Sequence, residues 1–256
     1  MIANYHTHTP RCNHATGREE DYVRNAIDRG FEILGFSDHT PYFFPGDYYS
    51  HFRMRPEQLK GYCDTVRLLQ KKYAGQISIP LGLEVEYYPA LFPQLLPVLQ
   101  EAGIEYILLG QHFVGNEINE HYSGNPTGDV SILKKYCFQV ADAMQTGLFT
   151  YLAHPDLIHF RGDARQYREH MRLVCTEARN CGIPLEVNML GHWSGRQYPN
   201  PAFWEIAAEE GCSIVMGCDA HAPEHLKKED TEQQLLRMIG HYGLKLLDRV
   251  DLRKIN

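Results

Sequence analysis

Short apolar runs alternate with segments of helical spacing along almost the whole chain, and this alternation limits the possible folds more than any other feature. Seven runs have the length and composition of buried strands: IANYHTH, ILGFSDH, ISIPLGLEVE, YILLGQH, YLAHPD, IPLEVN and SIVMGCDAH. Between them, apolar residues at helical spacing predict helices over 22–27, Pro56–Tyr73, Leu91–Ala102, Ile132–Gly147, Gln166–Cys181, Pro201–Glu210 and Thr231–Gly240. Strands and helices that alternate in this way predict a parallel sheet with helical crossovers.

The seven repeats predict one α/β domain over residues 1–256. We expect a distorted (β/α)7 barrel similar to a TIM barrel, with parallel strands inside and helices outside, because the usual barrel has eight repeats in ~250 residues. A doubly wound open sheet is the structural alternative. No low-complexity linker or break in composition marks a second domain. The longest irregular stretches, Thr40–Arg55, Phe113–Gly128 and Met189–Asn200, are expected to be loops over a functional site.

Composition favours a cytoplasmic protein that acts on small molecules. The seven cysteines are scattered and never spaced CxxC, which disfavours a disulfide framework and indicates a reducing compartment. No signal peptide is expected, and no run approaches the ~18 continuous apolar residues of a membrane helix. The formal charge is −7 and basic residues do not cluster, so we expect no nucleic acid partner. The oligomeric state is not predictable from this sequence.

Six of the seven apolar runs end in a side chain that can bind a metal ion. The side chains at these ends are His6, His8, His39, Glu84, His112, His154, Asp219 and His221. Residues just beyond the C-terminal ends of parallel barrel strands converge on one face, although they are far apart in sequence. The pattern therefore predicts a polynuclear metal site.

Each candidate ligand is a weaker signal alone than in the set. His6 and His8 are two residues apart on an extended segment, so both can reach one ion. Glu84 ends an apolar strand, where an unpaired carboxylate is costly, although Glu86 shares its face and is a rival. Asp219 and His221 also share one face. The remaining candidates, His14, His39, His112 and His154, would singly be read as ordinary histidines.

Taken together, these residues resemble the polymerase and histidinol phosphatase (PHP) superfamily, and within it the histidinol-phosphatases. The motifs that carry the resemblance are HTHTPRCNH, GFSDHTPY, GLEVEYYP, GQHF, AHPDLIHFRGD, EVN and GCDAH. The resemblance implies a distorted seven-stranded barrel that holds three divalent metal ions, which are zinc, iron or manganese. It implies a first ion at His6, His8, Glu84 and Asp219, a second at Glu84, His112 and His154, and a third at His14, His39 and His221.

The implied activity is hydrolysis of a small phosphate ester, in the first place L-histidinol phosphate, to L-histidinol and inorganic phosphate. We expect metal-bound hydroxide to attack phosphorus directly, with Glu84, Asp219 and His221 as catalytic residues. Arginine suits phosphoryl oxygens, and Arg161 is a better candidate for this contact than Arg196. His39 is a further candidate for substrate binding. The loop TPYFFPGDYYSHF could supply aromatic faces and a carboxylate for the rest of the substrate.

Other functions stay open on sequence alone. The substrate could be another small phosphomonoester. An amidohydrolase-type enzyme that cleaves carbon–nitrogen bonds also opens with HxH, but the histidines of the third ion have no place in it. A module of the kind attached to bacterial DNA polymerases is disfavoured by the sparse basic surface.

Overall fold

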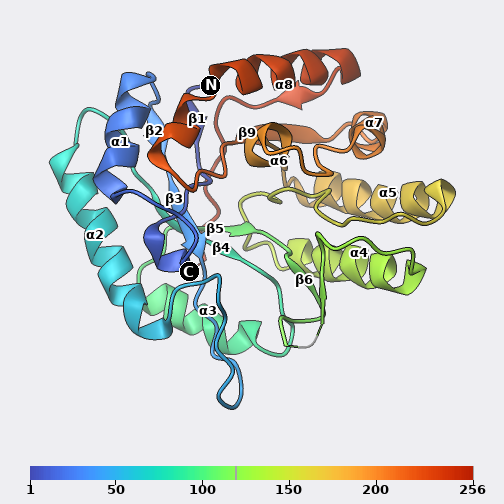
Figure 1. The fold of residues 1–256 in the computed structure, drawn as a ribbon, viewed down its shortest axis with the longest axis horizontal. Helices are drawn as coiled ribbons and strands as arrows, with labels where there is room; N and C mark the ends of the chain where they lie inside the picture. The colour runs from blue at the N-terminus through green and yellow to red at the C-terminus, as the bar shows by residue number, and fades with distance from the viewer. Residues whose placement is uncertain (119, 256) are drawn as a thin grey trace.

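The computed structural model describes residues 1–118 and 120–255, and its elements alternate between strand and helix (Figure 1). The strands are β1 (Ala3–Asn4), β2 (Ile33–Leu34), β3 (Phe36–His39), β4 (Leu81–Val85), β5 (Tyr106–Leu109), β6 (Phe113–Val114), β7 (His121–Tyr122), β8 (Leu185–Asn188), β9 (Ser213–Gly217) and β10 (Lys245–Leu246). The α-helices are α1 (Glu19–Asp28), α2 (Leu59–Lys72), α3 (Phe92–Glu101), α4 (Val130–Gln145), α5 (Ala164–Cys181), α6 (Met189–Trp193), α7 (Pro201–Glu209) and α8 (Glu229–Tyr242). Three short 3-10 helices are η1 (Pro10–Cys12), η2 (Pro56–Gln58) and η3 (Pro223–Lys227).

Local sequence explains where the long helices begin and end. Asp163 caps α5, because its side chain accepts hydrogen bonds from the backbone N–H groups of Arg165 and Gln166. Gly182 ends the same helix with a φ of 61°, a left-handed conformation that glycine adopts at little cost. The helices predicted from sequence are all present, with ends that differ by a few residues.

The main strands pair in parallel. In the order β3, β4, β5, the register places His39 beside Glu84 and Glu84 beside Leu108. A second parallel sheet has the order β10, β9, β8. Residue Leu152 bridges in parallel to Leu109 on one side and Leu185 on the other, so the segment around it lies between β5 and β8. Among the described residues, single bridges of this kind connect sheets of two or three strands. The predicted parallel α/β architecture is confirmed.

The segments that follow β1 and β9 also meet. Thr7, just after β1, bridges in parallel to Ala220, just after β9, and Figure 1 shows β1 and β9 near each other. The His8 N–H donates to the Ala220 carbonyl at 2.9 Å, and the Asn4 side chain accepts a hydrogen bond from the Cys218 N–H at 2.8 Å. These contacts bring the segment that carries His6 and His8 beside the segment that carries Asp219 and His221.

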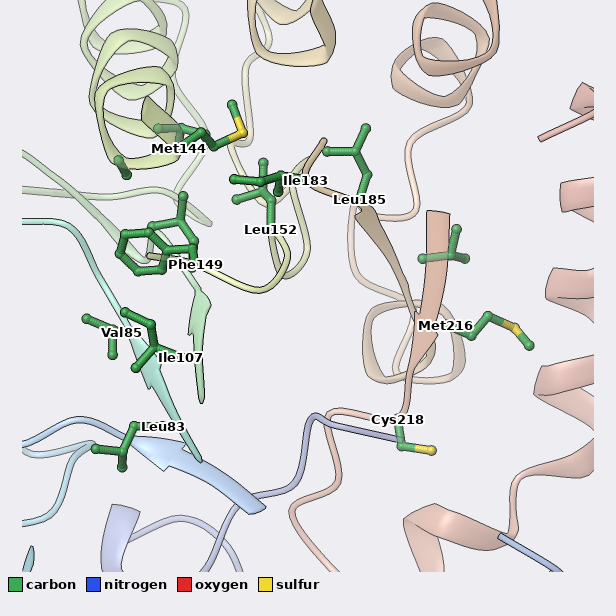
Figure 2. Close-up of a cluster of buried hydrophobic side chains, with 14 of the residues drawn as sticks. Leu83, Val85, Ile107, Met144, Phe149, Leu152, Ile183, Leu185, Met216 and Cys218 are labelled. Carbon is green, nitrogen blue, oxygen red and sulfur yellow. The ribbon is translucent and has the colours of Figure 1, made fainter. Parts of the chain in front are cut away.

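Apolar residues form two separate clusters. The larger cluster fills the space between strands and helices, and Figure 2 shows part of it, with Val85, Ile107 and Leu185 from strands and Met144 from α4. The smaller cluster draws on β1, β5, β9 and the segment around Leu152, with Ala3, Tyr5, Tyr106, Leu108, Tyr151, Ala153 and Val215 as its buried members. The Tyr106 hydroxyl donates to the Tyr5 carbonyl at 2.7 Å, which links β5 to the end of β1.

Two of the predicted loops contain regular structure. Phe113–Gly128 includes the antiparallel pair β6 and β7, although its residue 119 lies outside the described residues. Met189–Asn200 begins with α6, because the Asn188 side chain accepts a hydrogen bond from the Gly191 N–H and caps a short helix that apolar spacing does not reveal. Within residues 1–118 and 120–255, no helix is both long and apolar enough to cross a membrane.

Candidate metal centre

The candidate ligands meet at the C-terminal ends of the parallel strands. His39 is the last residue of β3 and Glu84 lies near the end of β4. The others lie in the segments that follow a strand: His6 and His8 after β1, His112 after β5, His154 after Leu152, and Asp219 and His221 after β9. His14 follows η1, at the edge of the same group. The predicted convergence of distant residues is therefore present.

Glu84 lies at the middle of the group. Its Oε1 lies 2.8 Å from His154 Nε2, 3.4 Å from His6 Nε2 and 3.7 Å from His112 Nε2. Its Oε2 lies 3.0 Å from His39 Nδ1 and 3.6 Å from His8 Nε2. Asp219 Oδ1 approaches His8 Nε2 at 3.2 Å and His6 Nε2 at 3.6 Å. One carboxylate thus touches five imidazoles, the arrangement that a bridging ligand requires.

Most of the imidazoles are oriented by an acceptor on Nδ1, which leaves Nε2 toward the centre. Nδ1 of His6 lies 2.8 Å from Glu186 Oε1, and Nδ1 of His112 lies 3.0 Å from Glu86 Oε1. The other acceptors are Asp38 for His8, the Cys12 carbonyl for His14 and the Asp219 carbonyl for His221. An imidazole that ligates a metal through one nitrogen almost always donates its other N–H in this way.

The donor set fits divalent cations. Several buried polar atoms that face the centre have no hydrogen-bond partner among the described residues: His6 Nε2, His8 Nε2, His39 Nδ1 and Glu84 Oε2. Two ligand atoms at ~2.1 Å from one tetrahedral ion would lie ~3.4 Å apart, close to the spacings seen around Glu84. Several groups of three have donor atoms within 4.8 Å of one another, and three of them match the predicted ligand sets: His6, His8 and Asp219; His6, Glu84 and His154; and His14, His39 and His221. Other such groups are His8, His39 and Glu84, and His8, Cys12 and His221.

Charge balance in the buried part of the centre also favours a cation. Burial alone would raise the pKa of Glu84, but the imidazoles of His112 and His6 outweigh it and hold that pKa well below its usual value. Burial opposes the charged form of His8, but the carboxylates of Asp219, Asp38 and Glu84 raise its pKa to about 9. Protonated imidazoles therefore neutralise these carboxylates in the protein alone. A divalent ion would replace the protons, so affinity should rise with pH.

The outer group has a different character. Burial and the positive charge on His8 lower the pKa values of His14, His39 and His221, so these imidazoles are neutral near pH 7. Nε2 of His14 and Nε2 of His221 lie 2.9 Å apart. Neutral imidazoles are the form that binds metal, and no proton must leave before an ion enters.

Sequence reasoning missed the residues that support the ligands. Glu186 is fully buried in β8, a strand for which no ligand was predicted. Its Oε1 also accepts from the Tyr151 hydroxyl at 3.2 Å, and its Oε2 accepts from the His154 N–H at 3.1 Å and the Asn188 side-chain amide at 2.9 Å. The signal was the run PLEVN, where a carboxylate in a buried strand needs partners.

We predict that Glu186→Gln weakens zinc binding about 10-fold to 100-fold, the usual cost of losing a partner that orients a metal ligand. Both Glu186 oxygens accept hydrogen bonds, one from His6 Nδ1 and one from the His154 N–H. The side-chain NH₂ group of a glutamine would face one of these N–H groups and could not accept its hydrogen bond. Zinc affinity is measured by competition with a chelator, with exposed Glu169→Gln of α5 as the control. A Glu186→Gln protein with the affinity of wild type would show that Glu186 does not orient His6.

Glu86 does not enter the centre, which resolves the rivalry with Glu84. Its carboxylate pairs with the Arg53 guanidinium at 2.9 Å and accepts from His112, on the side of the imidazole away from Glu84. His225 also supports the site, because its Nδ1 accepts a hydrogen bond from the His221 N–H at 3.1 Å.

The centre forms the floor of a cavity of about 470 Å³. Its lining residues are His14, His39, His51, Phe52, His112, Phe113, Tyr122, His154, Leu157, Leu190, Arg196, Tyr198, Asp219 and His221. All three of the predicted loops over the site contribute side chains. From the aromatic loop after His39, however, it is His51 and Phe52 that line the cavity. Tyr42, Phe43, Phe44, Tyr48 and Tyr49 line a separate, smaller cavity of about 220 Å³.

The two candidate arginines are placed differently. Arg196 lines the cavity, and its Nη1 donates to the Tyr198 hydroxyl at 3.0 Å. Arg161, the favoured candidate from sequence, is exposed, donates to His159 Nε2 at 2.9 Å and does not line the cavity. Arg161 lies seven residues after His154 on an irregular segment, and its side chain does not reach back to the centre. The structure thus reverses the order of the two candidates.

The parallel α/β fold and this histidine-rich centre define a PHP domain: the model of that family matches residues 4–190, and the chain belongs to the PHP domain family. Several relatives of the chain bear the name histidinol-phosphatase. The chain is 30% identical over 231 residues to the "Probable histidinol-phosphatase" of Deinococcus radiodurans, which covers 87% of both chains. It is also 30% identical over 246 residues to the "Histidinol-phosphatase" of Bacillus subtilis, which covers 84% of this chain and 92% of that one.

A solved structure shares the fold. The histidinol phosphate phosphatase of Lactococcus lactis subsp. lactis, crystallised with zinc, L-histidinol and phosphate, superposes with a TM-score of 0.75. It covers 98% of each chain at 17% sequence identity. At this identity the similarity establishes the fold alone. The predicted membership of the PHP superfamily is confirmed.

Proposed function

We propose that this protein is a metal-dependent phosphomonoesterase that hydrolyses L-histidinol phosphate to L-histidinol and inorganic phosphate, a reaction of histidine biosynthesis. The observation that carries the proposal is the convergence of seven imidazoles, Glu84 and Asp219 at one place, where five of the imidazoles and Asp219 line a cavity that Arg196 also lines. Relatives at 30% identity over most of the chain bear the name histidinol-phosphatase. Another small phosphomonoester is the alternative substrate.

We propose three divalent ions, zinc, iron or manganese, because imidazole-rich sites with carboxylates suit all three metals. The sets would be His6, His8, Glu84 and Asp219 for one ion, Glu84, His112 and His154 for the second, and His14, His39 and His221 for the third. When bound, such ions act as Lewis acids that lower the pKa of water and stabilise charge on phosphoryl oxygens.

The chain's own residues would position the reactants. Glu84 and Asp219 hold imidazoles around a common point, and His221 and His39 present ring atoms to the cavity. Among the described residues that line the cavity there is no serine, threonine or cysteine, and metal ions would occupy Asp219 and the ligand imidazoles, so attack by water on phosphorus would need no phosphorylated enzyme. The guanidinium of Arg196 would pair with phosphoryl oxygens.

We expect Arg196→Met to lower kcat/KM for a phosphate ester by about 10-fold to 100-fold, since hydrogen bonds to charged groups contribute about 1.5–3 kcal/mol. Metal content should not change. Arg161→Met is the matched control and should leave kcat/KM within about twofold of wild type, because surface substitutions of this kind are usually near neutral. A larger loss of kcat/KM for Arg161→Met than for Arg196→Met would favour Arg161 as the phosphoryl contact, as the sequence predicts.

The test of function is a comparison of substrates with metal-loaded protein. Histidinol phosphate should be hydrolysed with a kcat/KM about 10²-fold above that for sugar phosphates and other amino-alcohol phosphates, if the pocket discriminates by its polar contacts. No better kcat/KM than for the rest of the panel would indicate a general phosphomonoesterase. Consumption of a dipeptide-like amide or of single-stranded DNA in its place would contradict the proposal.

We further propose that residues 1–256 form one domain built on a distorted (β/α)7 barrel. The smaller apolar cluster supports this shape, because alternate residues of β1, β5, β9 and the segment around Leu152 pack together as they would inside a ring of strands. The contact of Thr7 with Ala220 would close that ring. A cytoplasmic location and the absence of nucleic acid or membrane partners stay predictions, supported by free cysteines and a charge of −7.

A further inference from the structure

Arg53 is a fully buried charge that belongs to none of the proposed ligand sets. It lies in the loop between β3 and α2 and is 1% exposed. Its Nη1 and Nη2 donate to the two oxygens of Glu86 at 3.0 and 2.9 Å. Its Nε and Nη2 donate to Glu117 Oε2 at 3.0 and 2.7 Å, and Nη1 also donates to the Thr40 carbonyl at 2.9 Å. A buried guanidinium with this many partners holds three chain segments in one geometry.

The first of these contacts leads to a candidate ligand. Glu86 accepts from His112 Nδ1 at 3.0 Å, on the same Oε1 that Arg53 holds. The Arg53 guanidinium, which donates to both Glu86 oxygens, holds this carboxylate in place as the partner of His112 Nδ1. A carboxylate held there fixes the proton of His112 on Nδ1 and leaves Nε2, 3.7 Å from Glu84, free to ligate.

A separate contact, with the ring of Phe52, connects Arg53 to the wall of the cavity. The Arg53 guanidinium lies 4.3 Å from the centre of the Phe52 ring. Phe52 in turn stacks on Phe113 at 5.7 Å and meets the His39 ring edge-on at 5.0 Å. Phe52 and Phe113 both line the cavity. Arg53 therefore touches a cavity residue on one side and the support of His112 on the other.

We propose that Arg53 is a positioning residue that acts on two parts of the site at once. Through Glu86 it sets the tautomer and orientation of His112, and through Phe52 and Glu117 it holds the loops that form the aromatic wall of the cavity. The proposal rests on the proposed function, in that His112 holds a metal ion and the cavity holds the phosphate ester. Arg53 itself does not line the cavity, so its effects pass through its neighbours.

The test separates the two effects with four variants. Arg53→Met should weaken zinc binding about 10-fold to 100-fold, as expected when the support of a ligand is lost, and should also raise KM. Glu86→Gln should reproduce the loss of zinc affinity, and Phe52→Leu should raise KM with zinc affinity unchanged. Arg53→Lys, which keeps the charge but not the fork, should recover part of the zinc affinity and leave KM raised. Zinc affinity is read by chelator competition, and kcat and KM with histidinol phosphate.

Controls keep a structural effect apart from a positioning effect. Arg172→Met removes an arginine that pairs with Glu209 and Glu210 between α5 and α7, and should change neither zinc affinity nor KM. Glu86→Gln and Arg53→Lys decide the test if Arg53→Met does not fold. Zinc affinity and KM within twofold of wild type in these folded variants would overturn the proposal. Turnover by the wild-type protein reports separately on the proposed function, because the role of Arg53 is judged from the ratio of variant to wild type.

Discussion

Replacing Glu84 by glutamine is expected to lower kcat/KM for phosphate esters by about 10³-fold or more, the largest effect of any single substitution proposed for this protein. The expected size follows from the several kcal/mol that a Lewis acid contributes to phosphoryl transfer, at 1.36 kcal/mol for each factor of ten. Glu84 is 1% exposed, and its two oxygens approach five imidazoles at 2.8 to 3.7 Å. An amide has one acceptor oxygen and lacks the charge, so it cannot bridge two cations.

The measurement is steady-state kinetics together with metal content per chain. Glu84→Gln should retain fewer ions than wild type. Glu101→Gln, at the exposed end of α3, removes a carboxylate of the same kind outside the centre and should leave both values unchanged. A Glu84→Gln protein with full metal content and activity within tenfold of wild type would show that Glu84 does not bridge ions.

Gly110→Ala should lower kcat/KM by at least about 10²-fold, although it removes no ligand, because displacement of a reacting group by ~1 Å can cost this much. A Cβ at this position would lie 2.0 Å from Glu84 Oε1 and 2.5 Å from its Cδ. The Glu84 carboxylate is held by imidazoles on its other side, so it would have to leave its place among them. Steady-state kinetics and metal content should change in the direction expected for Glu84→Gln.

The matched control is Gly61→Ala in α2, where an added Cβ meets no atom within 4 Å. Alanine favours a helix over glycine by up to about 1 kcal/mol, so this variant should be active and slightly more stable. Folding of both variants is compared by thermal unfolding. Wild-type activity in Gly110→Ala would contradict the placement of Glu84 against β5.

The ends of the strands could be predicted from the sequence, because the apolar run and the polar residue that follows it are adjacent in the chain. A short apolar run followed by a polar ligand identifies the end of a buried strand, as in YILLGQH before His112 or SIVMGCDAH before Asp219. Parallel strands place such ends on one side, so convergence follows from topology without knowledge of any contact. Spacing alone does not separate Glu84 from Glu86: Glu84 lies within β4 and Glu86 directly follows it, but Glu84 lies among the imidazoles and Glu86 pairs with Arg53.

The supporting residues could not be read because their partners are distant in sequence. Glu186 and His6 are 180 positions apart in sequence. The same three residues, LEV, contain Glu84 in one strand and Glu186 in another, so the local sequence does not show that their roles differ. Arg53 lies in the predicted loop Thr40–Arg55, and its partners Glu86 and Glu117 are 33 and 64 positions away in sequence. Arg161 and Arg196 lie on irregular segments, where the direction of a side chain depends on packing rather than on spacing.

X-ray diffraction recorded on both sides of the zinc absorption edge, from crystals of the whole chain grown with zinc, tests the metal centre most directly. We predict three anomalous peaks: one among His6, His8 and Asp219, one beside His112 and His154, and one among His14, His39 and His221, with Glu84 between the first two. A map with no peak near Glu84, or with zinc bound only outside these groups, would contradict a metal-dependent enzyme.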